Sequence, residues 1–153
     1  MAQPMNTGAA GISPVWPSSN AAIQPARQAY QILHFAFVLA PIAAGLDKFF
    51  HVLVNWDMYL APIIPQMLHV DAHTFMLVVG GIEIVAGLIV AFKPRIGAYI
   101  VALWLVGIIA NLLMHPNRFY DVAFRDFGLC LGALALARLS LEFDRPAATT
   151  QGP

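Results

Sequence analysis

A single carboxylate, Glu83, stands in the middle of an apolar run that extends from Phe75 to Phe92. Such a run is long enough to cross a bilayer, which takes about 20 residues. An ionisable side chain in a membrane span is costly, so it faces protein or water rather than lipid. Helical spacing puts Gly80 and Gly87 on the same side as Glu83, and small residues allow a neighbouring helix to approach. The sequence therefore predicts that Glu83 points into a polar interior between helices.

Polar residues on other apolar stretches can complete this interior. The predicted intramembrane network consists of Asp47, Lys48, Glu83, Asn111, Arg125 and Asp126. The glycines expected at helix contacts are Gly45, Gly80, Gly87, Gly128 and Gly132. Such polar groups can simply hold helices together, each contact contributing less than about 2 kcal/mol. Alternatively, the region around the carboxylate can bind a ligand such as a quinone or relay protons.

Histidines are the other residues that could do chemistry. His69 and His73 are four residues apart, a spacing that puts two imidazoles on one side of a helix, and His51 and Asp71 could complete a metal site. A haem would need two imidazoles on facing helices, for which His51 and His115 are the best pair. Because Asp71 has the context of a helix N-cap, His69 and His73 need not share a helix. Solvated histidines at the outer rim are therefore the favoured interpretation, and no metal site is predicted.

The overall composition is that of a membrane protein. Of 153 residues, 59% are hydrophobic and 10% are charged, whereas soluble domains carry about 25% charged residues. The formal net charge is zero, so no nucleic-acid partner is expected. The single cysteine, Cys130, excludes an internal disulfide and a paired-cysteine redox site. A lipid bilayer is the expected surrounding.

The elements that would position these residues are long apolar spans. Four are expected, at about 27–50, 73–92, 96–114 and 119–139. Prolines at 94 and 116 separate the last three, since proline does not continue a helix. Short connections make neighbouring helices antiparallel. The predicted fold is an all-α membrane protein, an antiparallel bundle of four transmembrane helices within residues 27–140.

The segment between the first two spans has a different character. Residues 51–72 mix aromatic side chains, prolines and acids, and are too broken to cross a bilayer. Trp56 and Tyr59 suit a membrane–water interface. We therefore expect a short interfacial helix or a cap on the bundle, with Asp71 as the N-cap of the next helix.

The two ends of the chain are predicted to be tails on the same side of the membrane. Residues 1–26 are rich in proline, alanine and serine and are predicted to be disordered, and residues 141–153 to be flexible. Basic residues in short loops mark the cytoplasmic side. One side would hold Arg27, Lys93, Arg95, Arg138 and Arg145, and the other Lys48 and Arg118. Both termini are therefore predicted to be cytoplasmic.

Three stretches of the sequence carry motifs of a known family. They are Ala44-Gly45-Leu46-Asp47-Lys48-Phe49, Gly80-Gly81-Ile82-Glu83-Ile84-Val85-Ala86-Gly87-Leu88 and Arg125-Asp126-Phe127-Gly128-Leu129-Cys130-Leu131-Gly132. Together with the four-span layout, they resemble the DoxX-like family of small four-helix membrane proteins, over residues 30–140. The matching positions are Gly45, Lys48, Glu83, Gly87 and Asp126.

This resemblance implies a multi-pass protein of the bacterial cytoplasmic (inner) membrane. The family includes subunits linked to thiosulfate:quinone oxidoreduction and to other redox complexes. We therefore expect an accessory or docking subunit of a quinone-linked redox system rather than an enzyme. The alternatives are an oxidoreductase subunit with a bound quinone or haem, and a small transporter that uses Glu83. Other membrane subunits or further copies of the chain are the expected partners.

Overall fold

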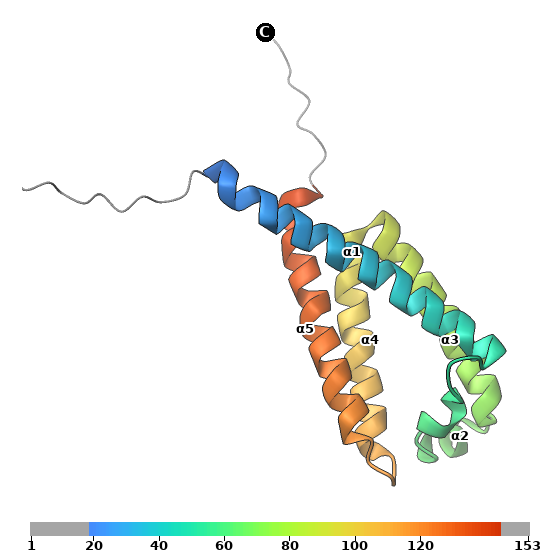
Figure 1. The fold of residues 1–153 in the computed structure, drawn as a ribbon. Helices are drawn as coiled ribbons and strands as arrows, with labels where there is room; N and C mark the ends of the chain where they lie inside the picture. The colour runs from blue at the N-terminus through green and yellow to red at the C-terminus, as the bar shows by residue number, and fades with distance from the viewer. Residues whose placement is uncertain (1–18, 145–153) are drawn as a thin grey trace, which may run out of the picture.

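The computed structural model describes residues 19–144, and this part of the chain forms helices and no strands. The four long helices are α1 (Ser19–Phe50), α3 (Ala72–Phe92), α4 (Pro94–Met114) and α5 (Tyr120–Phe143). They lie beside one another (Figure 1). The two short helices are the 3₁₀ helix η1 (Trp56–Tyr59) and α2 (Ile63–Leu68). The all-helical fold class predicted from the sequence is confirmed.

Three of the long helices are long and apolar enough to cross a membrane. They are the Ile23–Phe50 part of α1 and the whole of α3 and α4. These three helices indicate a multi-pass membrane protein. The helix α5, predicted as the fourth span, is not among them, since charged residues such as Arg125, Asp126 and Arg138 interrupt its apolar sequence.

The helix α1 begins earlier than the sequence indicates. Residues 19–26 form its first turns, although the sequence places them in a disordered tail because of Pro25. Pro41 also lies inside α1. Membrane helices tolerate such prolines because neighbouring turns and helices satisfy the freed backbone groups. At the other end, α5 continues to Phe143, past the predicted start of the C-terminal tail at 141. The rest of both predicted tails, 1–18 and 145–153, lies outside the described residues.

The long helices associate as two closely packed pairs, α1 with α3 and α4 with α5. The main apolar core lies mostly between α4 and α5, and small side chains let these two helices come close. Its alanines from this pair are Ala98, Ala102, Ala133 and Ala137. Phe37 of α1 and Val90 of α3 extend the same core. It therefore joins the two pairs.

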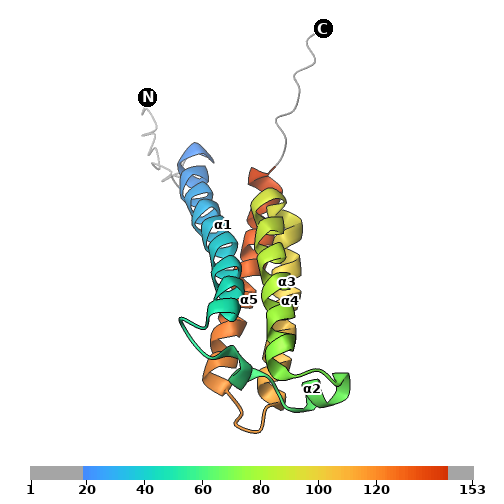
Figure 2. The same cartoon turned by 90° about the vertical axis from the view of Figure 1, so that its right-hand side faces the viewer.

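The broken segment 51–71, which we call the cap, lies at one end of the long helices (Figure 2). Asn111 of α4 holds it there: its Oδ1 accepts a hydrogen bond from the Ala61 backbone N–H at 2.9 Å, and its Nδ2 donates to the Tyr59 carbonyl at 2.7 Å. The start of α1 and the end of α5 lie at the opposite end of the molecule (Figure 2).

The cap ends where α3 begins. The Asp71 carboxylate accepts a hydrogen bond from the Thr74 backbone N–H at 3.1 Å, so the predicted N-cap is confirmed. Hydrogen bonds from the Thr74 side chain and backbone stabilise the ionised carboxylate and lower the pKa of Asp71.

Candidate functional site

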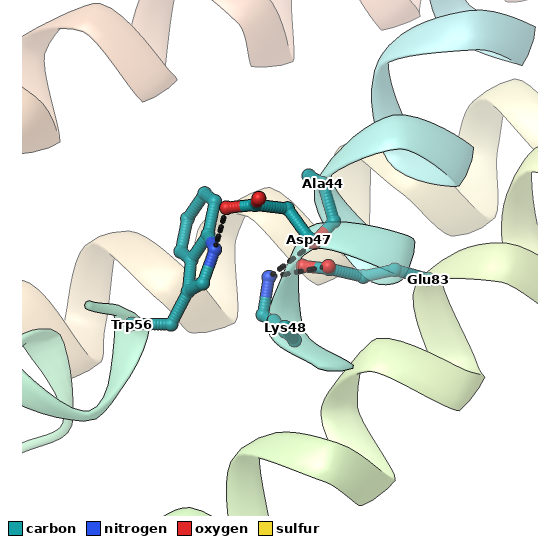
Figure 3. Close-up of polar contacts among 5 residues, drawn as sticks. All are labelled: Ala44, Asp47, Lys48, Trp56 and Glu83. Carbon is teal, nitrogen blue, oxygen red and sulfur yellow. Dashed lines mark hydrogen bonds and ion pairs between the residues drawn. The ribbon is translucent and has the colours of Figure 1, made fainter. Parts of the chain in front are cut away.

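A buried ion pair joins α1 to α3 (Figure 3). Lys48, in the last turn of α1, donates from Nζ to Oε2 of Glu83 at 2.5 Å. Their side chains are only 3% and 8% exposed. Lys48 Nζ also lies 3.8 Å from the centre of the Trp56 ring and 3.5 Å from the Ala44 carbonyl oxygen. The ammonium group thus has a carboxylate, a carbonyl and an aromatic face as partners, and the charge of Glu83 is matched.

Glycines allow α1 and α3 to approach closely enough for this pair to form. A Cβ atom added at Gly45 would lie 2.6 Å from the Gly80 carbonyl oxygen, and one at Gly80 would lie 2.7 Å from the Gly45 carbonyl oxygen. A Cβ at Gly87 would lie 2.6 Å from Cγ1 of Ile42 on α1. The structure therefore places three of the predicted packing glycines at one helix contact.

Asp47, the neighbour of Lys48, serves the turn that follows α1. Its Oδ1 accepts hydrogen bonds from the backbone N–H groups of Val52 and Leu53, both at 2.9 Å. Its Oδ2 accepts from the indole N–H of Trp56 at 2.7 Å (Figure 3). Asp47 therefore fixes the path of the chain into the cap, and positions the ring that covers Lys48.

Trp56 is a site residue that the sequence does not identify as one. It follows Asp47 by nine residues across an irregular turn, and such a separation does not specify a contact. The aromatic signal indicates only an interfacial location. The indole N–H needs an acceptor when it is removed from water. This requirement is the signal in the sequence that could indicate a polar contact of Trp56.

The other members of the predicted network lie elsewhere. Asn111 binds the backbone of the cap, as described above. Arg125 is 65% exposed, and its Nε contacts the buried carboxylate of the adjacent Asp126 at 3.4 Å. Among the described contacts, none links these three residues to Lys48 or Glu83. The structure thus divides the six residues among the ion pair with its neighbour Asp47, the cap contact and the α5 pair.

The two predicted packing glycines of α5 differ from those of α1 and α3. A Cβ at Gly128 would meet no other group within 4 Å among the described residues. A Cβ at Gly132 would lie 3.2 Å from the ring of Phe37 on α1. Spacing along a helix identifies which residues share a side, but not whether another helix covers that side.

The candidate histidines separate into three environments. His51 and His73 stack, with ring centroids 5.2 Å apart, and Asp57 lies beside His73. His69 follows the end of α2 in a left-handed conformation, so it does not share a helix with His73. His115 is buried, and its Nδ1 accepts a hydrogen bond from the Asn117 backbone N–H at 3.1 Å. None of its described contacts is with His51, the residue that would be its best partner for a haem.

Two grooves on the described part of the chain do not reach the ion pair. One lies beneath the cap and is lined in part by Asp57, Leu60 and His115. The other lies on α3 and is lined by apolar residues such as Val78 and Val85. The lining of neither groove includes Lys48 or Glu83. The pair is therefore enclosed between helices and does not open into either groove.

Comparison of the chain with protein-family models, with curated proteins and with solved structures finds no match. The DoxX-like resemblance therefore stays a prediction. The enclosed pair of Lys48 and Glu83, with Asp47 and Trp56 around it, is the feature from which a function can be inferred.

Proposed function

We propose that the protein is a small integral membrane protein with four antiparallel transmembrane helices, and that it serves as an accessory or docking subunit of a membrane redox system. The observation that carries the non-catalytic role is the closed pair of Lys48 and Glu83. Its charges match one another, and neither described groove reaches them. A carboxylate that relays protons or couples transport needs a path to water, whereas an enclosed pair suits a structural contact between helices.

The proposed topology has two supports. The helix α5 packs along α4, and the long side chains of Arg125 and Arg138 are exposed and can extend toward the membrane surface. The start of α1 and the end of α5 lie at one end of the molecule (Figure 2). Basic residues predicted on that side favour a cytoplasmic location of both termini in a bacterial inner membrane.

The docking role is supported by the outer surface of α1. A stripe of large apolar side chains at helical spacing is exposed there, and its members are Ile32, Phe35, Leu39 and Leu46. Such a stripe contacts lipid or another subunit. The link to a quinone-dependent redox partner derives from the resemblance of the three family-like stretches alone.

The test is purification of the tagged full-length chain from native membranes in mild detergent. We expect it to retain, in a fixed ratio, a second subunit that carries a redox cofactor. The double substitution Phe35→Ala/Leu39→Ala on α1 should weaken this association. Leu103→Ala, at an exposed position of α4, is the matched control and should leave it intact. Isolation of the chain alone, or only with copies of itself, would contradict the proposal.

Two further measurements test the alternatives. An absorption spectrum of the purified chain with a haem Soret band, or extraction of bound quinone, would favour an oxidoreductase subunit. Ion or solute flux in liposomes that depends on Glu83 would favour a transporter. We expect a colourless protein without such flux.

A further inference from the structure

We propose that His51, Asp57 and His73 form a binding site for a divalent first-row transition metal ion, such as Zn²⁺, at the cap end of the molecule. Each residue offers one ligand atom, and these atoms all lie within 4.8 Å of one another. This site is separate from the proposed accessory function, and it groups His73 with residues other than His69, its neighbour in the sequence.

Three different elements contribute the ligands. His51 follows the last residue of α1 in a left-handed conformation, with φ of 52°. Asp57 belongs to η1, and His73 lies in the first turn of α3. The preceding contacts of Asp47 and Asp71 hold these segments in place, and both carboxylates are occupied by hydrogen bonds. The fold therefore brings the three ligands together before any ion binds.

The distances suit a metal ion. Zinc binds imidazole nitrogen and carboxylate oxygen at about 2.0–2.2 Å, so tetrahedral ligand atoms are about 3.4 Å apart. Nδ1 of His73 and Oδ2 of Asp57 are already 3.2 Å apart. The rings of His51 and His73 are nearly parallel, with an interplanar angle of 27°. Because imidazole lone pairs lie in the ring plane and the ligand atoms are within 4.8 Å of one another, the two stacked rings must turn toward a common point for all three ligand atoms to meet one ion.

The carboxylate also has an unused oxygen. Oδ1 of Asp57 is buried and has no hydrogen-bond partner among the described residues. A buried oxygen without a partner is costly, and a cation beside the carboxylate would offset that cost. Two stacked imidazoles repel when both are charged, but neutral rings can both donate lone pairs to one ion. A hydrogen bond between His73 and Asp57 alone would leave His51 without a role.

The ligand set indicates the class of ion. Two imidazoles and one carboxylate suit zinc and neighbouring first-row metals rather than Ca²⁺ or Mg²⁺, which prefer oxygen ligands. The His73 side chain is 51% exposed and that of Asp57 is 28% exposed, so an ion can enter from the aqueous side. Such an ion would link the end of α1, the cap and the start of α3.

The test is titration of the metal-stripped, tag-free full-length chain in detergent with Zn²⁺, followed by calorimetry, and with Co²⁺, followed by absorption. We expect one equivalent to bind and to raise the thermal unfolding midpoint. His73→Ala should weaken binding by more than about 100-fold, beyond the 10–100-fold loss that follows removal of a merely orienting partner. Asp57→Asn should abolish the metal-dependent rise of the midpoint.

Two further variants make the result specific. His51→Asn removes the third ligand and keeps a residue that tolerates the left-handed conformation, so its folding is expected to survive. His69→Asn is the matched control, because His69 is exposed, lies outside the cluster and shares the left-handed conformation of His51. Absence of saturable binding by the parent chain would overturn the proposal. Equal metal affinity of the His73→Ala variant and the parent would also overturn it, as would a loss of affinity in His69→Asn equal to that in His73→Ala.

Discussion

The two helix pairs of this protein are built by different means. Between α1 and α3 the backbones meet at Gly45 and Gly80, and the buried pair of Lys48 and Glu83 lies beside this contact. Between α4 and α5 the contact is made by alanine, valine and leucine side chains, while Arg125 points outward. Figure 1 shows the two pairs side by side. The buried pair of opposite charges therefore belongs to α1 and α3, whereas the buried carboxylate of Asp126 on α5 has the mostly exposed Arg125 as its described ionic partner.

This difference has an energetic consequence. An apolar contact loses stability gradually as its volume changes, because neighbouring side chains can partly adjust. A buried charge that loses its partner has no such adjustment available. Loss of one member of the buried pair in α1 and α3 should therefore lower the free energy of unfolding much more than loss of an exposed charge of α5.

The largest effect is expected for Lys48→Met, which leaves Glu83 buried without its partner. Loss of one member of a buried pair costs about 3–5 kcal/mol of unfolding free energy. The control Arg138→Met removes an exposed charge of α5 and should cost at most about 1 kcal/mol. Denaturant titration of both variants in mixed micelles measures the difference.

A double substitution sharpens this result. Lys48→Met/Glu83→Met removes both charges, so it should recover much of the stability lost in Lys48→Met. Equal stability of Lys48→Met and Arg138→Met would show that the ion pair does not distinguish the two helix pairs.

The next largest effect concerns the glycines. Gly45→Ala and Gly80→Ala each force a Cβ against backbone of the facing helix, and such overpacking costs about 1–3 kcal/mol. Gly128→Ala is the control, because its Cβ meets nothing among the described residues and alanine favours the helix by about 1 kcal/mol. Thermal unfolding should show opposite signs for the two groups. A destabilised Gly128→Ala variant would point to a partner that covers this side of α5.

A smaller effect is expected for Asn111→Leu. Asn111 is the residue through which α4 holds the cap, and its replacement leaves the Ala61 N–H and the Tyr59 carbonyl without this partner. Because the cap can open to water, we expect a loss of about 1–2 kcal/mol, in the range for unsatisfied polar groups. Hydrogen exchange of residues 56–68 should accelerate, with little change in α5. Asn117→Leu, at an exposed position, is the control.

The smallest effect is a pH dependence at Asp71. Because its pKa is lowered in the folded state, its ionised form contributes stability that is present above the ordinary aspartate pKa of about 3.9. That contribution is lost as the pH falls through the lowered value. The difference in unfolding midpoint between the parent and Asp71→Ala should therefore be largest near neutral pH and shrink in strong acid. A difference that grows on acidification would contradict the N-cap role.

The helical fold class, most helix ends and the N-cap at Asp71 can be predicted from the sequence alone. These features depend on interactions over a few residues: long apolar runs, prolines that interrupt them, and a carboxylate that accepts a hydrogen bond from a nearby backbone N–H. The first turns of α1 are not evident from the sequence, because they contain Pro25 and proline ordinarily interrupts a helix.

Which polar groups meet depends on the tertiary structure. Lys48 and Glu83 are separated by 35 residues, and their contact depends on how α1 and α3 are rotated and how closely their glycines approach. Adjacent residues such as Asp47 and Lys48 take different roles because successive side chains of a helix point about 100° apart. The path of the cap brings Trp56 to this site. Spacing along one helix contains no information about that path.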